Sequence, residues 1–121
     1  MNRRRRLTVD EVVTVVRAAA AWLDAANGRG EPELTLRILK VTEEAGEAAG
    51  AWIGVIGQNP RKGVTHTLAE VAAELADVAF TALVAIESLG FDADVVLADC
   101  ARKIGYRLDG RGGEPAARDA G

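Results

Sequence analysis

The chain has a single cysteine, Cys100, among its 121 residues, which excludes an internal disulfide and is typical of a reducing compartment. No apolar run reaches the roughly 18 residues that a membrane span requires. The basic residues 3–6 are not followed by the apolar region of a secretion signal. We therefore expect a cytoplasmic protein with no membrane partner.

Sequence signals for β-strands are also scarce. Aromatic residues make up only 4% of the chain, proline occurs three times, and β-branched residues do not alternate with polar ones. Alanine, leucine and valine dominate instead, and apolar residues recur every three or four positions. This pattern predicts an all-α fold, a four-helix bundle with one modest hydrophobic core.

Residues that favour helix starts divide the chain into four segments. Thr8 suits the N-cap of the first helix and Pro32 the first turn of the second. Either Thr65 or Thr67 can cap the third helix, and Thr67 has Glu70 three residues later, as in a capping box. The expected helices cover residues 8–27, 32–56, 67–89 and 92–108.

The expected helical domain covers residues 8–108. Residues 1–7 are predicted to form a disordered basic arm, and the Gly-rich residues 109–121 a disordered tail. The net charge of −3 gives no indication of nucleic acid binding, and four arginines without interleaved aromatics are weak evidence for it. We expect no specific nucleic acid partner.

Positive charge is missing from a long central segment. No Lys or Arg occurs between Lys62 and Arg102, although seven acidic residues fall there. A solvated helix face normally mixes charges of both signs, with acidic and basic residues paired four positions apart. The imbalance indicates that something outside the segment supplies positive charge, and a divalent cation would do so.

The second and third predicted helices each carry an apolar face beside an acidic one. The apolar residues of the second are Leu34, Ile38, Val41, Ala45, Ala48, Trp52 and Val55. Those of the third are Leu68, Val71, Leu75, Val78, Ala82 and Ile86. Acids that border a core-facing surface can point into a cleft between two packed helices.

The acidic faces contain Glu43, Glu44 and Glu47 on one helix and Glu74 and Asp77 on the other. Spacings of three and four residues place carboxylates on the same face of a helix. Carboxylate oxygens are hard ligands that favour Mg²⁺ or Mn²⁺ over Zn²⁺. The sequence therefore predicts a magnesium site between the two helices, in which Mn²⁺ can substitute; the alternative is a solvated acidic face.

The pattern Glu43-Glu44-x-x-Glu47, followed after a loop by Glu74-x-x-Asp77, resembles the metal-binding signature of the MazG-like all-α NTP pyrophosphatases. The resemblance covers roughly residues 33–107. It implies a four-helix core that assembles into a homodimer or homotetramer and hydrolyses a nucleoside triphosphate, with Mg²⁺, to a monophosphate and pyrophosphate. By motif position it implies Glu44, Glu47, Glu74 and Asp77 as metal ligands. Glu43 would either lie behind these ligands or help to orient the attacking water as the catalytic residue.

Candidate substrate contacts lie outside the acidic motif. They are Lys40, Lys62, Lys103, Arg107 and Trp52. Lys103 and Arg107, one turn apart on the fourth helix, have the chemistry to hold phosphates. Trp52 lies on an apolar face, which favours a core position over stacking on a base. Trp22 on the first helix has the same two alternatives.

Two other functions compete with hydrolysis. A carboxylate-bridged di-iron bundle needs Glu-x-x-His pairs, and the only histidine, His66, does not follow a glutamate by three residues. A non-catalytic helical-bundle protein that mediates nucleotide or protein-partner binding remains the alternative. No motif identifies the base or the sugar of the substrate.

Overall fold

The computed structural model describes residues 4–113, which form four α-helices: α1 (Val9–Asn27), α2 (Glu31–Ile56), α3 (Leu68–Ser88) and α4 (Ala93–Gly113). The described residues contain no strand. The prediction of an all-α, four-helix fold is confirmed. Among these helices, none is long and apolar enough to cross a membrane.

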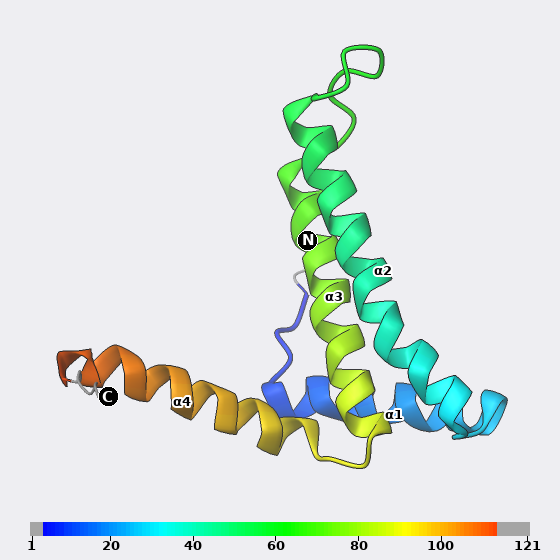
Figure 1. The fold of residues 1–121 in the computed structure, drawn as a ribbon, viewed down its shortest axis with the longest axis vertical. Coiled ribbons are helices and arrows are strands. Elements are labelled where there is room, and N and C mark those ends of the chain that lie inside the picture. Colours follow the sequence, from blue (N-terminus) through cyan, green and yellow to red (C-terminus); the bar gives the residue numbers. More distant parts are fainter. Residues whose placement is uncertain (1–3, 114–121) are drawn as a thin grey trace.

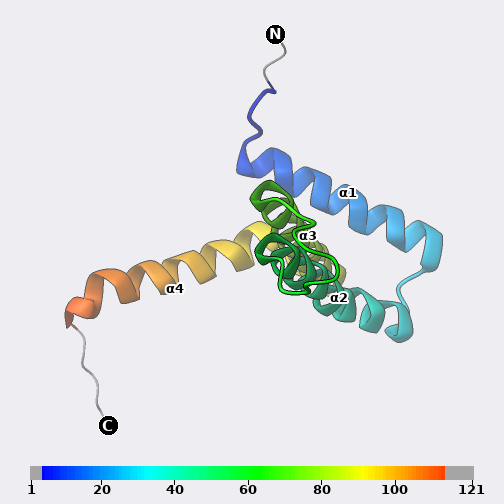
Figure 2. The ribbon, with the colours of Figure 1, turned by 90° about the horizontal axis from the view of Figure 1, so that it is seen from above.

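The helices α2 and α3 form a long antiparallel pair joined by the loop at residues 57–67 (Figure 1). Helix α1 crosses the end of this pair opposite to the loop (Figures 1 and 2). Helix α4 begins at that same end and runs away from the other three helices in both views. Three helices therefore share a core, while most of α4 lies outside it.

The predicted helix starts are confirmed by their capping interactions. Thr8 and Glu11 form a reciprocal capping box at the start of α1, and Thr67 and Glu70 form one at the start of α3. Pro32 lies in the first turn of α2, where its missing N–H has no helical partner to lose. Each box satisfies two backbone N–H groups that the first turn of a helix leaves free.

The core is small and centres on the crossing of α1 with α3. Val16, Ala20 and Val84 are buried there. Four partly buried residues pack against them: Ala19, Leu23, Phe80 and Leu83.

The predicted apolar faces of the second and third helices are partly wrong. Ile38 and Trp52 of α2 are 46% and 48% exposed, and Leu68 and Leu75 of α3 are 67% and 55% exposed. The faces that meet contain smaller residues, such as the buried Ala48 and Ala51 of α2. Small side chains let the two backbones approach closely, and the larger apolar residues then lie on the outside of the pair.

The fourth helix ends at Gly113, five residues beyond its predicted end at residue 108. Residues 109–113, predicted as part of a disordered tail, are therefore helical. Residues 114–121 of that tail and residues 1–3 of the predicted arm lie outside the described residues. Residues 4–7 have no regular secondary structure, and Arg5 forms an ion pair with Glu11 at 3.1 Å.

A buried arginine joins the ends of three helices. The Arg37 side chain of α2 is 4% exposed, and its Nη1 donates to Asp24 of α1 at 2.7 Å and to the hydroxyl of Ser88 of α3 at 3.1 Å. Its Nε donates to Glu33 at 2.8 Å, and its Nη2 to the carbonyl of Gly28. These hydrogen bonds lower the pKa of both Asp24 and Glu33.

We expect the substitution Arg37→Met to lower the free energy of unfolding by about 3 kcal/mol, because it removes the basic partner of Glu33 and the more buried of the two basic partners of Asp24. Urea unfolding followed by circular dichroism at pH 7 measures this loss. Arg29→Met is the matched control, since Arg29 also pairs with Asp24 but is half exposed, and it should cost less than about 1 kcal/mol.

A comparison of the wild type with Arg37→Met at different pH values tests whether the lost stability comes from charge. The lowered carboxyl pKa values stabilise the wild type above pH 5, and this contribution disappears as the pH falls through the folded-state values. The wild type should therefore lose more stability than Arg37→Met between pH 6 and pH 3. Equal losses in the two proteins would contradict the assignment.

Candidate metal and nucleotide site

Three acidic side chains meet between α2 and α3. One carboxylate oxygen from each of Glu44, Glu74 and Asp77 lies within 4.8 Å of the others. Glu44 and Glu74 are half-buried and Asp77 is exposed, so the group opens toward solvent on one side. Three of the four predicted metal ligands are thus brought together by helices that are separate in the sequence. We refer to Glu44, Glu74 and Asp77 as the carboxylate cluster.

Glu74 supplies an independent indication that something binds here. Its Oε1 is buried and has no hydrogen-bond partner among the described residues. A buried carboxylate oxygen without a partner is costly, because it has lost its hydration and gained nothing in exchange. A cation at the cluster would satisfy this oxygen.

Glu47, the fourth predicted ligand, lies beside the cluster but is not one of its three members. The negative charge of Glu44 raises the pKa of the Glu47 carboxyl, and burial, Glu74 and Glu43 raise it further. The shift shows that Glu47 is close enough to feel the same charges. These acids repel one another in the absence of a cation.

Lys40 is the only basic residue that forms ion pairs with these acids within residues 4–113. Its Nζ lies 2.8 Å from Glu43 Oε1 and 3.4 Å from Glu44 Oε2. Glu43, the predicted catalytic residue, is exposed at the edge of the cluster and shares this lysine. One lysine is too little positive charge for five neighbouring acids.

The donor set fits a small, hard divalent cation. Carboxylate oxygens are the protein ligands that Mg²⁺ and Mn²⁺ prefer. Donor oxygens around an octahedral Mg²⁺ are about 4.2 Å apart when opposite and about 3.0 Å apart when adjacent, so the three carboxylates, within 4.8 Å of one another, would move closer together on binding the ion. An exposed side on the cluster leaves positions for water and for phosphate oxygens.

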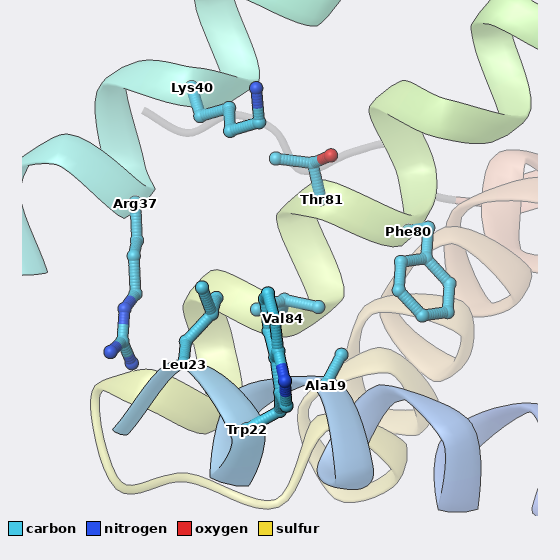
Figure 3. A pocket seen from close by; sticks show the side chains of 8 residues that line it. All are labelled: Ala19, Trp22, Leu23, Arg37, Lys40, Phe80, Thr81 and Val84. Carbon is cyan, nitrogen blue, oxygen red and sulfur yellow. The ribbon is translucent and has the colours of Figure 1, made fainter. Parts of the chain in front are cut away.

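An apolar pocket lies next to the cluster, between α1, α2 and α3. Its volume is about 200 Å³. Its lining residues are Ala19, Trp22, Leu23, Arg37, Lys40, Phe80, Thr81 and Val84. Figure 3 shows Trp22, Leu23 and Ala19 on α1 at one end, with Lys40 and Thr81 at the other. Lys40 pairs with Glu44, and Thr81 follows Asp77 by one helical turn, so that end of the pocket adjoins the cluster.

The sequence predicted the position of Trp22 in this pocket only in part. Trp22 is 70% exposed, which leaves its ring available to a flat ligand. The sequence offered core packing or base stacking for this residue, and its exposure excludes a fully buried position. Phe80 and Thr81 were not predicted as site residues, because their position across from Trp22 depends on how α1 crosses α3.

The other predicted substrate contacts are not part of this site within one chain. Lys62 is exposed in the loop at the far end of the α2–α3 pair. Trp52 is half exposed on α2 and does not line the pocket. Lys103 and Arg107 are exposed on α4, the helix that runs away from the others. Of the five, the structure places only Lys40 beside the cluster.

We expect Mg²⁺ or Mn²⁺ to stabilise the folded protein. A cation at ten times its Kd adds about 1.4 kcal/mol, which raises Tm by roughly 5 °C for a domain of this size. Differential scanning fluorimetry with increasing metal measures the shift. Glu74→Gln should abolish it, whereas Glu31→Gln, an exposed acid on the same helix as Glu44, should keep it. An unchanged Tm for the wild type at saturating metal would refute a divalent-cation site.

Comparisons with known proteins do not add to this geometry. The chain matches no family model, no curated protein and no solved structure. The resemblance to the MazG-like enzymes therefore rests on the acidic motif alone, and the functional argument on the site itself.

Proposed function

We propose that this protein is a Mg²⁺-dependent nucleoside triphosphate pyrophosphohydrolase of the MazG-like type, which converts an NTP or dNTP to the monophosphate and pyrophosphate. The observation that carries the proposal is the carboxylate cluster, with its partnerless buried oxygen on Glu74, beside an apolar pocket that contains an exposed tryptophan. The first feature suits a metal-bound triphosphate and the second a nucleobase. A phosphate-only substrate would not need the pocket.

Each residue of the site has a defined task in this proposal. Glu44, Glu74 and Asp77 would hold the cation, with Glu47 beside them as the fourth ligand. When bound, Mg²⁺ neutralises charge on the phosphates and lowers the pKa of water. Hydrolysis of a phosphoanhydride depends on such electrostatic stabilisation and on positioning more than on a covalent nucleophile.

Glu43 is the residue that we propose to orient the attacking water. Its carboxylate is exposed at the edge of the cluster and forms an ion pair with Lys40 at 2.8 Å. A carboxylate held there can accept a hydrogen bond from water and align it with the phosphorus atom. Lys40 is close enough to both acids to contact a phosphate oxygen as well.

The pocket would receive the base. Trp22 can stack on a planar ring, and Thr81 offers a hydroxyl at the end nearer to the cluster. Arg37 lines the pocket, but its donors are engaged by Asp24, Glu33, Ser88 and Gly28. Because the lining has few free polar groups, stacking should contribute more to base binding than hydrogen bonds do.

We also propose that the protein assembles into a homodimer or homotetramer in the cytoplasm. Exposed apolar residues on α2 and α4 support the assembly, since isolated soluble chains seldom expose so many large apolar side chains together. They include Leu36, Leu39, Ile53, Ile56, Leu97, Ile104 and Leu108.

The primary test is pyrophosphate release from a panel of NTPs and dNTPs with and without Mg²⁺. We expect metal-dependent release, and a loss of more than about 100-fold in Glu44→Gln and Asp77→Asn, because even residues behind metal ligands contribute 10- to 100-fold. Glu31→Gln is the control. Reaction in ¹⁸O-labelled water should place the label in the monophosphate.

Two outcomes would contradict the proposal. Release of orthophosphate instead of pyrophosphate would mean attack at the γ-phosphorus. No release from any nucleotide by folded protein would favour a non-catalytic bundle that binds nucleotides or a protein partner.

Substitution of Trp22 tests the base pocket. Base–aromatic stacking contributes about 1–3 kcal/mol, so Trp22→Ala should raise KM for the preferred nucleotide by about 10-fold or more, with a smaller change in kcat. Trp22→Phe, which retains a ring, should recover most of the affinity. Steady-state kinetics on the wild type, Trp22→Ala and Trp22→Phe measure these changes. An unchanged KM in Trp22→Ala would exclude stacking of the base on Trp22.

A further inference from the structure

We infer that Lys40 is an internal counter-ion of the carboxylate cluster, which competes with a divalent cation for Glu44 and turns to the phosphates of the nucleotide once the cation is bound. Lys40 then weakens metal binding in the absence of a nucleotide and strengthens nucleotide binding in the presence of the metal. The competition for Glu44 rests on the metal site alone, whereas the contact with phosphate also rests on the proposed function.

The two contacts that Lys40 makes with the acids differ in length and in exposure. Its Nζ donates a hydrogen bond to Glu43 Oε1 at 2.8 Å, and the side chain of Glu43 is 61% exposed. The same nitrogen lies 3.4 Å from Glu44 Oε2, and the side chain of Glu44 is only 13% exposed. The longer contact, with Glu44, is therefore the one that involves the carboxylate cluster.

A divalent cation and Lys40 cannot both hold Glu44 without cost. Glu44 contributes one of the three oxygens that lie within 4.8 Å of one another in the cluster. A cation bound at about 2.1 Å from a Glu44 oxygen would lie closer to the Lys40 ammonium than the roughly 8 Å over which physiological salt screens charges. The two positive charges then repel each other, so the presence of one weakens the binding of the other.

Lys40 has the freedom to leave Glu44. Its side chain is 55% exposed, and within residues 4–113 its ammonium contacts only Glu43 and Glu44. A lysine carries a point charge on a flexible stem, so it can change partners without moving the backbone. Arg37, one turn earlier on α2 and also in the pocket wall, is buried with all its donors engaged. Of these two basic side chains, only Lys40 can turn toward a ligand.

The position of Lys40 between the pocket and the cluster indicates what it would meet. It lines the pocket at the end that Thr81 also lines, opposite to Trp22 (Figure 3). With the base beside Trp22 and the phosphates at the cluster, the ammonium lies along the path of the triphosphate. Lysine has three N–H donors, and hydrogen bonds from it to phosphate oxygens are charge-assisted. Lys40 would therefore exchange a carboxylate for a phosphate.

This exchange couples the two ligands of the site. With a cation on Glu44, Lys40 becomes available to a phosphate, and a phosphate that engages Lys40 removes its competition for Glu44. By thermodynamic reciprocity, each ligand then raises the affinity for the other by the same factor. This coupling adds to any direct bond between the phosphates and the metal.

Titration with Mn²⁺ in the absence of nucleotide tests the competition, with isothermal titration calorimetry as the measurement. Lys40→Met should lower the Kd for Mn²⁺ by about 3- to 10-fold, because it removes a positive charge beside the ion. Lys40→Arg retains the charge and should bind Mn²⁺ as the wild type does. Lys62→Met is the matched control, since it removes the same charge from the exposed loop at the far end of the α2–α3 pair and should leave the Kd unchanged.

The sign of the change separates competition from support. If Lys40 only held Glu44 in position for the metal, its removal would raise the Kd for Mn²⁺. An unchanged or higher Kd in Lys40→Met would therefore overturn the inference, and so would a wild type that does not bind Mn²⁺. Equal decreases in Lys40→Met and Lys62→Met would also overturn it, because net charge alone would then explain the effect.

Uncleavable nucleotides test the contact with phosphate. The probes are the α,β-methylene analogues of ATP, GTP, CTP and UTP, titrated at saturating Mn²⁺ beside the four nucleosides, which lack phosphates. Lys40→Met should raise the Kd of the best-bound analogue by about 3- to 10-fold, because it removes a hydrogen bond from a charged donor. The Kd of the corresponding nucleoside should not change.

The two titrations can fail separately. An analogue that binds equally well to the wild type and to Lys40→Met would overturn the contact with phosphate. No binding of any analogue to the wild type with Mn²⁺ would refute the proposed function and the phosphate contact together. The titration with Mn²⁺ alone would still decide whether Lys40 competes for Glu44.

Discussion

The repulsion among carboxylates at the α2–α3 pair is the constraint on which the interpretation of this molecule depends. Packing of small residues such as Ala48 and Ala51 holds Glu44 close to Glu74 and Asp77. Like charges at such short range raise the pKa of Glu47. One buried oxygen of Glu74 also has no hydrogen-bond partner among residues 4–113. Such an arrangement lowers the stability of the fold, and this supports the binding function proposed for the cluster.

A second charged group has the opposite character. Arg37 is buried as deeply as the apolar core, but each of its donors has an acceptor, and it joins α1, α2 and α3 at one end of the molecule. It also forms one wall of the pocket beside the cluster. The satisfied network therefore positions the helices that carry Trp22 and Lys40, whereas the carboxylate cluster lacks enough positive charge among the described residues.

The hydrophobic core of one chain is sparse. A few valines and alanines with Leu23, Leu83 and Phe80 form the interior, and most of α4 contributes nothing to it. Large apolar residues lie instead on the outer faces of α2 and α4. The proposed assembly would bury these residues.

Local chemistry determined the helices. Thr8 with Glu11 and Thr67 with Glu70 are capping pairs that a reader can recognise from the sequence, and helical spacing placed Glu74 and Asp77 on one face. The prediction that this face meets the acids of the second helix followed from the same periodicity. It was correct for Glu44, while Glu47 lies beside the cluster.

Only the tertiary structure decided which apolar residues are buried. The faces drawn from periodicity included Ile38, Trp52 and Leu75, which are exposed because the helices meet along small residues instead. The pocket of Trp22, Phe80 and Thr81 and the outward course of α4 were equally beyond the sequence. Spacing along a helix determines which residues share a face, because that depends on the backbone of one segment. The tertiary structure determines which face of a helix is buried and which residues cover it, because helices that are distant in the sequence cross there.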